Sequence, residues 1–147
     1  MNFDEITAEL EKLEAKDFDF NNAEMDGPER LDNLVRDLLA TNEPELATIQ
    51  MFRLMERLND SELGSPGPLV HALESLDYRD ALSESVQRCP TELSLWMLNR
   101  ILNTDLSSTE RVKYVDLLRR SSVHEKSTER VKEVARDFLQ FQVAKNA

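Results

Sequence analysis

The stretch TELSLWMLNRILN, Thr91–Asn103, decides the fold class of this chain. Wound as a helix, it presents leucine, methionine, isoleucine and tryptophan side chains on nearly every side. A surface helix shows a single apolar stripe, whereas a helix that is apolar all round has to be covered by other elements. The stretch therefore predicts a buried central helix.

The rest of the chain also has helical character. Only three of the 147 residues are glycine, aromatic residues make up 6%, and there is no long β-branched run. We predict an all-α fold of about eight short helices in antiparallel pairs, arranged as a HEAT/armadillo-like helical stack. A compact helical bundle is the alternative. The stack is favoured because the helices are short and one of them suits the inner layer of a stack.

The segment LGSPGPLVHALESL, Leu63–Leu76, is the most unusual in composition, and we interpret it as a sharp corner that opens a helix. Pro66 and Gly67 suit the middle of a type II turn, in which Gly67 takes a positive φ. The segment has neither the Gly-Lys-Ser/Thr end of a phosphate-binding loop nor a Gly-x-Ser-x-Gly elbow. His71 lies one turn before Glu74, a spacing more typical of a surface hydrogen bond than of acid–base catalysis. We therefore predict no enzymatic activity.

A short repeat marks two further helix starts. The hexapeptide STERVK occurs at Ser108–Lys113 and again at Ser127–Lys132. Each copy places a hydroxyl residue just before an acidic residue and an apolar stripe, as a helix N-terminus requires. Ser107 and Glu110 also have the spacing of a capping box. The repeat therefore predicts a helical hairpin.

Charge divides the chain unequally. Residues 1–62 contain 17 acidic and 6 basic side chains, whereas residues 63–147 contain 12 of each, so the net charge of −11 lies in the first part. We predict a single helical domain over 1–147, acidic over 1–62 and charge-balanced over 63–147. Such an acidic field repels nucleic acid and attracts a basic partner.

Cysteine and histidine are scarce. Cys89 is the one cysteine, so no internal disulfide forms and a reducing compartment is expected. His71, His124 and Cys89 do not have the spacing of a zinc site, and no cofactor is predicted. The first residues lack the features of a signal peptide, and no apolar run is long enough to span a membrane. We expect a cytoplasmic protein that is a monomer or a weak dimer and contacts neither nucleic acid nor membrane.

The acidic segment from Asp17 onward partly matches a calcium-binding loop. Asp17, Asp19 and Asn21 occupy EF-hand positions 1, 3 and 5. The motif then fails, because Asn22 replaces the glycine at position 6 and Pro28 replaces the glutamate at position 12. We therefore predict no metal site.

The same segment is better interpreted as a contact surface for a protein. Phe18 and Phe20 alternate with carboxylates, and aromatic anchors among carboxylates suit a basic partner. The alternative is that both phenylalanines tuck under the loop. The predicted partner-binding residues all lie in the acidic part of the chain: Asp17, Phe18, Asp19, Phe20, Glu24, Asp26, Glu56, Asp60 and Glu62.

Two segments carry a resemblance to a known family. GSPGPLVHALES, Gly64–Ser75, and RCPTELSLWMLNRILN, Arg88–Asn103, resemble the core of small helical immunity proteins encoded beside bacterial polymorphic toxins, including contact-dependent and secreted ones. The resemblance covers roughly residues 46–120, so the acidic N-terminal segment and the last helix lie outside it. It implies a protein that neutralises a cognate toxin domain inside the producing cell and has no catalytic activity.

These observations lead to one functional hypothesis and one alternative. We expect a non-enzymatic immunity protein that binds a cognate toxin, of nuclease type with a basic surface, through an acidic N-terminal face. The alternative is a helical-repeat adaptor or scaffold that binds peptide segments of a host protein.

Overall fold

The computed structural model describes residues 1–146, which form eight α-helices, one short 3₁₀-helix and no strand. The all-α prediction is therefore confirmed. The elements in order are α1 (Phe3–Glu11), η1 (Ala15–Phe18), α2 (Gly27–Leu39), α3 (Pro44–Arg57), α4 (Gly67–Glu74), α5 (Arg79–Arg88), α6 (Glu92–Leu102), α7 (Ser108–Ser121) and α8 (Glu129–Lys145). None of these helices is both long enough and apolar enough to cross a membrane.

The chain divides into two compact units, each with its own core. Unit 1 comprises Met1–Tyr78, and unit 2 begins at Arg79. A single domain over 1–147 stays a prediction.

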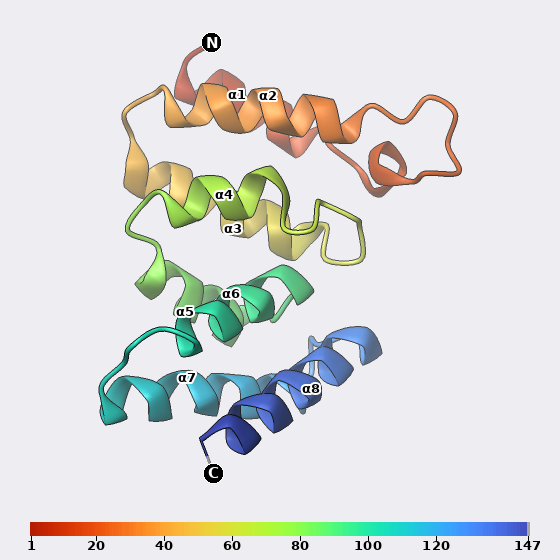
Figure 1. The fold of residues 1–147 in the computed structure, drawn as a ribbon. Coiled ribbons are helices and arrows are strands. Elements are labelled where there is room, and N and C mark those ends of the chain that lie inside the picture. The colour runs from red at the N-terminus through yellow and green to blue at the C-terminus, as the bar shows by residue number, and fades with distance from the viewer. Residues whose placement is uncertain (147) are drawn as a thin grey trace. The chain divides into compact units, whose positions relative to one another are not determined.

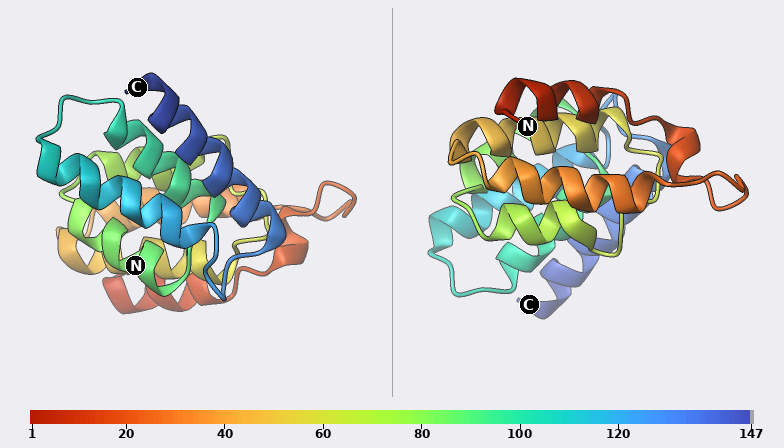
Figure 2. Two further views of the ribbon diagram at one scale, coloured as in Figure 1. Left: turned by 90° about the horizontal axis from the view of Figure 1, so that it is seen from below. Right: turned by 90° about the horizontal axis from the view of Figure 1, so that it is seen from above.

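Unit 1 consists of two stacked helical hairpins. Figure 1 shows that α1 and α2 run in opposite directions, as do α3 and α4. Helix α1 packs on α3 and helix α2 on α4, so each hairpin contributes one helix to each layer (Figure 2). The side chains that fill the space between the layers include Ile6, Leu31, Leu38, Met51, Phe52 and Leu69, each at most 1% exposed. This is the packing expected of a helical stack.

Unit 2 repeats the pattern. Helix α5 pairs with α6 and α7 with α8, while α5 packs on α7 and α6 on α8. Helix α6 contacts all three neighbours, and its buried residues are Ser94, Leu95, Met97, Leu98, Ile101 and Leu102. The predicted buried helix at 91–103 is therefore confirmed. Its Trp96 is half-buried, with the guanidinium of Arg100 4.8 Å from the ring centroid.

The proline–glycine corner differs in detail from the prediction. Gly67 takes φ +85°, as expected, and opens α4. Pro66, however, has φ −83° and ψ −26° and follows a cis peptide bond. A type II turn requires a ψ near +120° at this position, so the predicted turn type is wrong. The backbone of Gly64 lies very close to that of Gly67, since a Cβ on Gly64 would lie 2.3 Å from the Cα of Gly67.

Both copies of STERVK begin helices, as predicted, but in different registers. In α7 the N-cap is Ser107, one residue before the hexapeptide, and it forms the predicted capping box with Glu110. In α8 the N-cap is Thr128, inside the hexapeptide, whose hydroxyl accepts from the Val131 amide at 3.1 Å. The residue preceding the second copy is Lys126, which has no side-chain oxygen to cap a helix, and the hydroxyl of Ser127 donates to the carbonyl oxygen of Ser121 at 2.8 Å, so Thr128 takes the role.

Candidate functional site

The charge imbalance follows the division into units. Residues 1–78 carry 19 acidic and 6 basic side chains, a net charge of −13. Residues 79–147 carry 10 acidic and 12 basic side chains, a net charge of +2. Unit 1 is therefore the source of the negative field, and the predicted site residues all belong to it.

The chain between η1 and α2, Asp19–Asp26, forms a loop that extends away from the helices of unit 1, hereafter the projecting loop (Figure 1). Short-range hydrogen bonds organise it. Asp19 Oδ1 accepts from the Asn21 amide at 2.9 Å, and Asn22 Oδ1 accepts from the Glu24 amide at 3.1 Å. Such side-chain bonds to a backbone amide two residues on define tight turns. The loop is thus extended but locally ordered.

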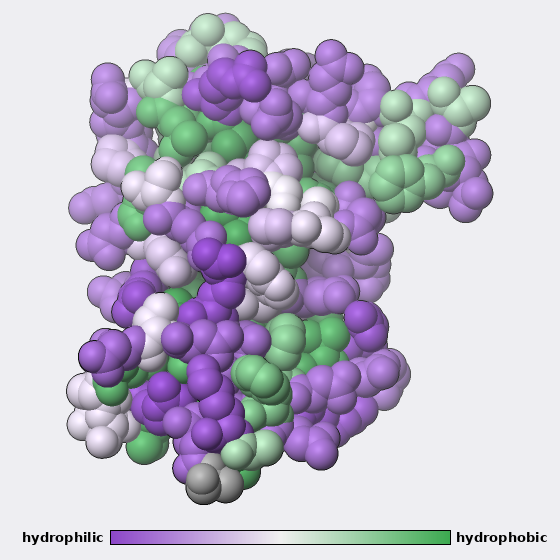
Figure 3. All heavy atoms as spheres, in the orientation of Figure 1, coloured by the Kyte–Doolittle hydropathy of each residue, from purple (hydrophilic) through white to green (hydrophobic). Residues whose placement is uncertain are grey.

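The two phenylalanines of this segment have opposite environments. Phe20 is 71% exposed, whereas Phe18 is 3% exposed and belongs to the core of unit 1. In Figure 3 the projecting loop shows hydrophobic atoms among hydrophilic ones. The alternative expectation, burial, therefore holds for Phe18 alone, and a contact role of Phe20 stays a prediction. The prediction that Phe18 lies on a contact surface is wrong, because its ring is covered.

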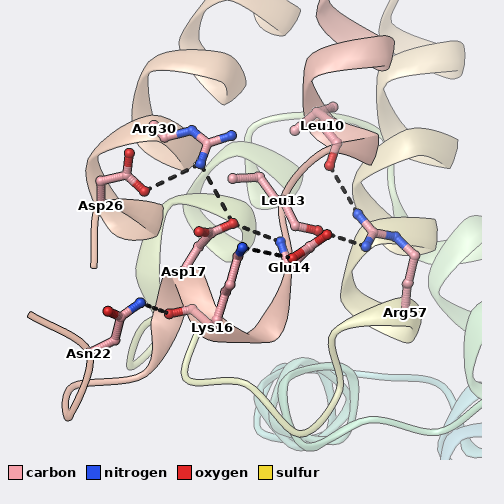
Figure 4. A network of polar contacts seen from close by, with 9 residues as sticks. All are labelled: Leu10, Leu13, Glu14, Lys16, Asp17, Asn22, Asp26, Arg30 and Arg57. Carbon is pink, nitrogen blue, oxygen red and sulfur yellow. Dashed lines mark hydrogen bonds and ion pairs between the residues drawn. The ribbon is translucent and has the colours of Figure 1, made fainter. Parts of the chain in front are cut away.

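Asp17 is also a structural residue. Its Oδ2 accepts from the Glu14 amide at 2.9 Å and lies 3.5 Å from the guanidinium of Arg30, which also reaches Asp26 Oδ1 at 3.3 Å (Figure 4). Arg30 therefore ties the segment that enters the projecting loop to the segment that leaves it. The prediction that the Asp17 side chain is presented to a partner is corrected, since the residue is only 9% exposed.

Close backbone packing also holds together the two ends of the projecting loop, where η1 precedes it and α2 follows it. A Cβ on Gly27 would lie 2.4 Å from the carbonyl oxygen of Asp17 and 2.9 Å from Cε1 of Phe18. Only glycine allows the first turn of α2 to approach η1 this closely. Asn22 adds one more tie, because its Nδ2 donates to the carbonyl oxygen of Lys16 at 2.9 Å (Figure 4). The projecting loop is held firmly at both ends.

The remaining predicted residues fall into two groups. Asp19, Glu24 and Asp26 are exposed on the projecting loop. Asp60 and Glu62 are exposed after the end of α3, and Glu56, on its last turn, is half-buried. Figure 1 shows the projecting loop and the segment after α3 at the same end of the unit 1 helices. The structure therefore brings carboxylates from two separate parts of the sequence to one end of the unit.

The residue types used for metal binding and acid–base catalysis are dispersed over the described part of the chain. Among residues 1–146, no three His, Cys, Asp or Glu side chains lie together in a way that holds a metal ion. His71 is exposed on α4. His124 uses both ring nitrogens within unit 2: Nε2 lies 2.8 Å from the carbonyl oxygen of Gln87, and Nδ1 accepts from the Lys126 amide at 3.0 Å.

One surface feature was missed by sequence reasoning. A hollow of about 360 Å³ lies between α1 and α3 in unit 1, hereafter the α1–α3 hollow. It is lined by Leu10, Glu11, Gln50, Arg53, Leu54 and Arg57. Arg53 and Arg57 are four residues apart on one helix, and this spacing is the signal that could have revealed them. Arg57 donates to the carbonyl oxygens of Leu13 at 2.8 Å and Leu10 at 2.9 Å (Figure 4).

Apolar side chains continue the same face of α3. Leu46 is 45% exposed and Ile49 is 41% exposed, whereas Phe52 is buried. On a helical projection Leu46 falls beside Arg53 and Arg57, with Ile49 next to them. The outward face of α3 is thus apolar at its start and basic at its end.

Comparison of the chain with protein-family models, with curated proteins and with solved structures finds no match in any of the three. The class of protein rests on the structure itself. The chain is an all-helical protein whose acidic unit 1 carries a projecting loop with an exposed aromatic side chain.

Proposed function

We propose that this chain is a non-enzymatic immunity protein that binds and neutralises a cognate bacterial toxin domain with a basic, nucleic-acid-binding surface. The observation that carries the proposal is Phe20, which is 71% exposed on an ordered acidic loop of a unit with net charge −13. The resemblance of residues 64–75 and 88–103 to immunity proteins is the reason for naming a toxin as the partner.

The charges and the aromatic ring have different roles in this proposal. The field of unit 1 steers a basic partner and raises the association rate, an effect that salt screens. Carboxylates at the end of unit 1, including Asp19 and Glu24, occupy a groove that otherwise receives phosphates. The ring of Phe20 fills an apolar site on the partner and lowers the dissociation rate.

Co-purification of the chain with the protein encoded by the neighbouring gene tests the proposal, followed by a growth assay in which that protein is expressed with and without the chain. We expect a complex at submicromolar concentrations and rescue of growth. If no complex forms at micromolar concentrations, the proposal is wrong.

Variants separate the two roles of the loop. Glu24→Lys should lower the association rate and its dependence on salt, whereas Phe20→Ala should raise the dissociation rate about thirtyfold, as loss of an interface anchor does. Glu133→Lys is the matched control, because it makes the same charge change at an exposed position of unit 2. Equal effects of Glu24→Lys and Glu133→Lys would show that net charge, rather than the loop, governs binding.

The alternative, a helical-repeat adaptor that binds peptide segments of a host protein, is favoured by one observation. Within each unit two helical hairpins stack layer on layer, as in repeat proteins that bind peptides. A gene neighbourhood without a toxin-like reading frame, together with capture of a host protein that Phe20→Ala leaves unchanged, would favour the adaptor.

A further inference from the structure

We propose that the α1–α3 hollow of one copy of this chain receives the projecting loop of a second copy, so that the free protein forms a weak symmetric dimer. The inference concerns self-association of the chain alone and does not depend on the proposed function. It accounts for two exposed features of unit 1, the ring of Phe20 and the outward face of α3.

The projecting loop supplies an apolar group beside negative charge. Phe20 is the most exposed aromatic side chain of the described residues, at 71%, and Asp19 and Glu24 are exposed near it in the sequence. Because the loop is held at its base by Arg30 and ordered by its own turns, little conformational freedom is lost when it is bound.

The α1–α3 hollow supplies the complementary chemistry. Four of the six basic side chains in unit 1 form ion pairs with its carboxylates, namely Lys12, Lys16, Arg30 and Arg36. Arg53 and Arg57 are the two that, among the described residues, have no carboxylate within ion-pair distance. In a unit of net charge −13, they create a local basic site. A carboxylate of the incoming loop gains a charge-assisted hydrogen bond there.

The hollow also has room and apolar surface for an aromatic ring. Its volume of about 360 Å³ lies within the range of about 300–1,000 Å³ typical of pockets that enclose organic ligands. Leu10 and Leu54 contribute to its lining, and Leu46 and Ile49 extend the apolar surface along α3. Glu11 is the one carboxylate in the lining, and it leaves a local excess of positive charge.

The occupant is a second copy because the loop of each molecule points away from its own helices (Figure 1). Loop and hollow belong to the same unit, so a twofold axis makes both contacts at once and closes the assembly at a dimer. Each chain carries a net charge of −11, and this repulsion keeps the dimer weak at low salt. Salt screens the long-range repulsion more than the partly desolvated contacts, so dimerisation should strengthen as ionic strength rises.

Analytical ultracentrifugation of the full chain over a range of concentrations and salt tests the inference. We expect a monomer–dimer equilibrium that Phe20→Ala weakens about thirtyfold, as loss of an aromatic anchor does. Arg53→Glu should abolish the dimer, because the loop then meets a negative hollow. Arg36→Glu is the matched control: it makes the same charge change at another exposed position of unit 1 and should leave the dimer within about threefold of the parent, because screening at physiological salt is strong.

A charge exchange between two variants makes the test specific. Glu24→Lys puts a cation on the loop that then faces the arginines of the hollow, and Arg53→Glu puts a carboxylate in the hollow that then faces the acidic loop, so neither variant should dimerise alone. In an equimolar mixture the new lysine of one variant faces the new glutamate of the other, and the unchanged acidic loop faces the unchanged hollow, so a heterodimer should form. A monomer at all concentrations, a mixture that stays monomeric, or a dimer unaffected by Phe20→Ala and Arg53→Glu would each overturn the inference. Far-ultraviolet circular dichroism of every variant establishes that it is folded.

Discussion

Replacement of Arg30 by methionine should release the base of the projecting loop. The guanidinium of Arg30 lies 3.5 Å from Asp17 Oδ2 and 3.3 Å from Asp26 Oδ1, on opposite sides of the loop. Methionine keeps an unbranched apolar stem on α2 but removes the charge and its donors. Asp17 would then keep one hydrogen bond, from the Glu14 amide at 2.9 Å, while its side chain stays 12% exposed.

The size of the effect follows from the distance and the burial. Two unit charges 3.5 Å apart attract by about 5 kcal/mol at an effective dielectric constant near 20. Desolvation of the pair offsets more than half of this, which leaves about 2 kcal/mol. Arg36 provides the comparison, since its bond of 3.0 Å to Asp32 joins side chains that are 71% and 57% exposed. Exposed pairs of this spacing contribute about 0.4 kcal/mol.

Amide hydrogen exchange measured by mass spectrometry distinguishes the two variants. The difference of about 1.5 kcal/mol predicts exchange about tenfold faster over residues 15–26 in Arg30→Met than in Arg36→Met. Helices of unit 2 should exchange at the parent rate in both variants. Equal exchange of residues 15–26 in the two variants would refute the reasoning, because it would mean that the Arg30 bonds contribute no more than a surface ion pair.

Three further predictions concern stability. Gly27→Ala should destabilise unit 1 by about 2 kcal/mol in urea unfolding, because its Cβ would lie 2.4 Å from the carbonyl oxygen of Asp17 and the backbone would have to shift. Thr128→Ala should cost about 1 kcal/mol through the lost N-cap, whereas Thr109→Ala, at the same place in the other STERVK copy, should be nearly neutral because that threonine is not the N-cap. Burial raises the pKa of the Tyr114 phenol above its ordinary value of 10.0, with a counteracting effect of Arg79. The phenol is therefore harder to ionise in the folded state, so its contribution to stability is present below about pH 10 and lost above it, and Tyr114→Phe should remove this part of the alkaline stability loss in pH-dependent urea unfolding.

The fold class was predictable because it depends on composition and periodicity, which are local. The apolar character of Thr91–Asn103 correctly predicted a buried helix, and the serine and threonine before each STERVK stripe correctly predicted two helix starts. The two identical hexapeptides begin their helices differently because Lys126 replaces the capping serine of the first copy and the hydroxyl of Ser127 is bonded to Ser121. The turn at Pro66 was missed for a different reason, since Pro-Gly is compatible with more than one backbone geometry.

The environment of the two phenylalanines was not predictable from local sequence. Phe18 and Phe20 both follow an aspartate, and both are flanked by polar residues. Phe18 is buried because the first turn of α2, at Gly27, lies against η1, and Arg30 fixes Asp17 beside it. These contacts join residues 9 to 13 positions apart in the sequence, across a loop whose path the sequence does not specify. Phe20 lies in the projecting loop, beyond the contacts that bury Phe18, and its ring is exposed.

The net charge of unit 1 does not reveal the local basic site that Arg53 and Arg57 form. A sum of −13 describes the far field, which governs how fast a basic partner arrives. The near field depends on which cations are already paired. Most of the basic side chains of unit 1 are neutralised by carboxylates close in sequence, such as Glu9 for Lys12 and Asp32 for Arg36, whereas Arg53 and Arg57 line a hollow and, among the described residues, have no carboxylate within ion-pair distance. An acidic unit can therefore present a basic contact, and a partner is selected by that local arrangement once the far field has brought it close.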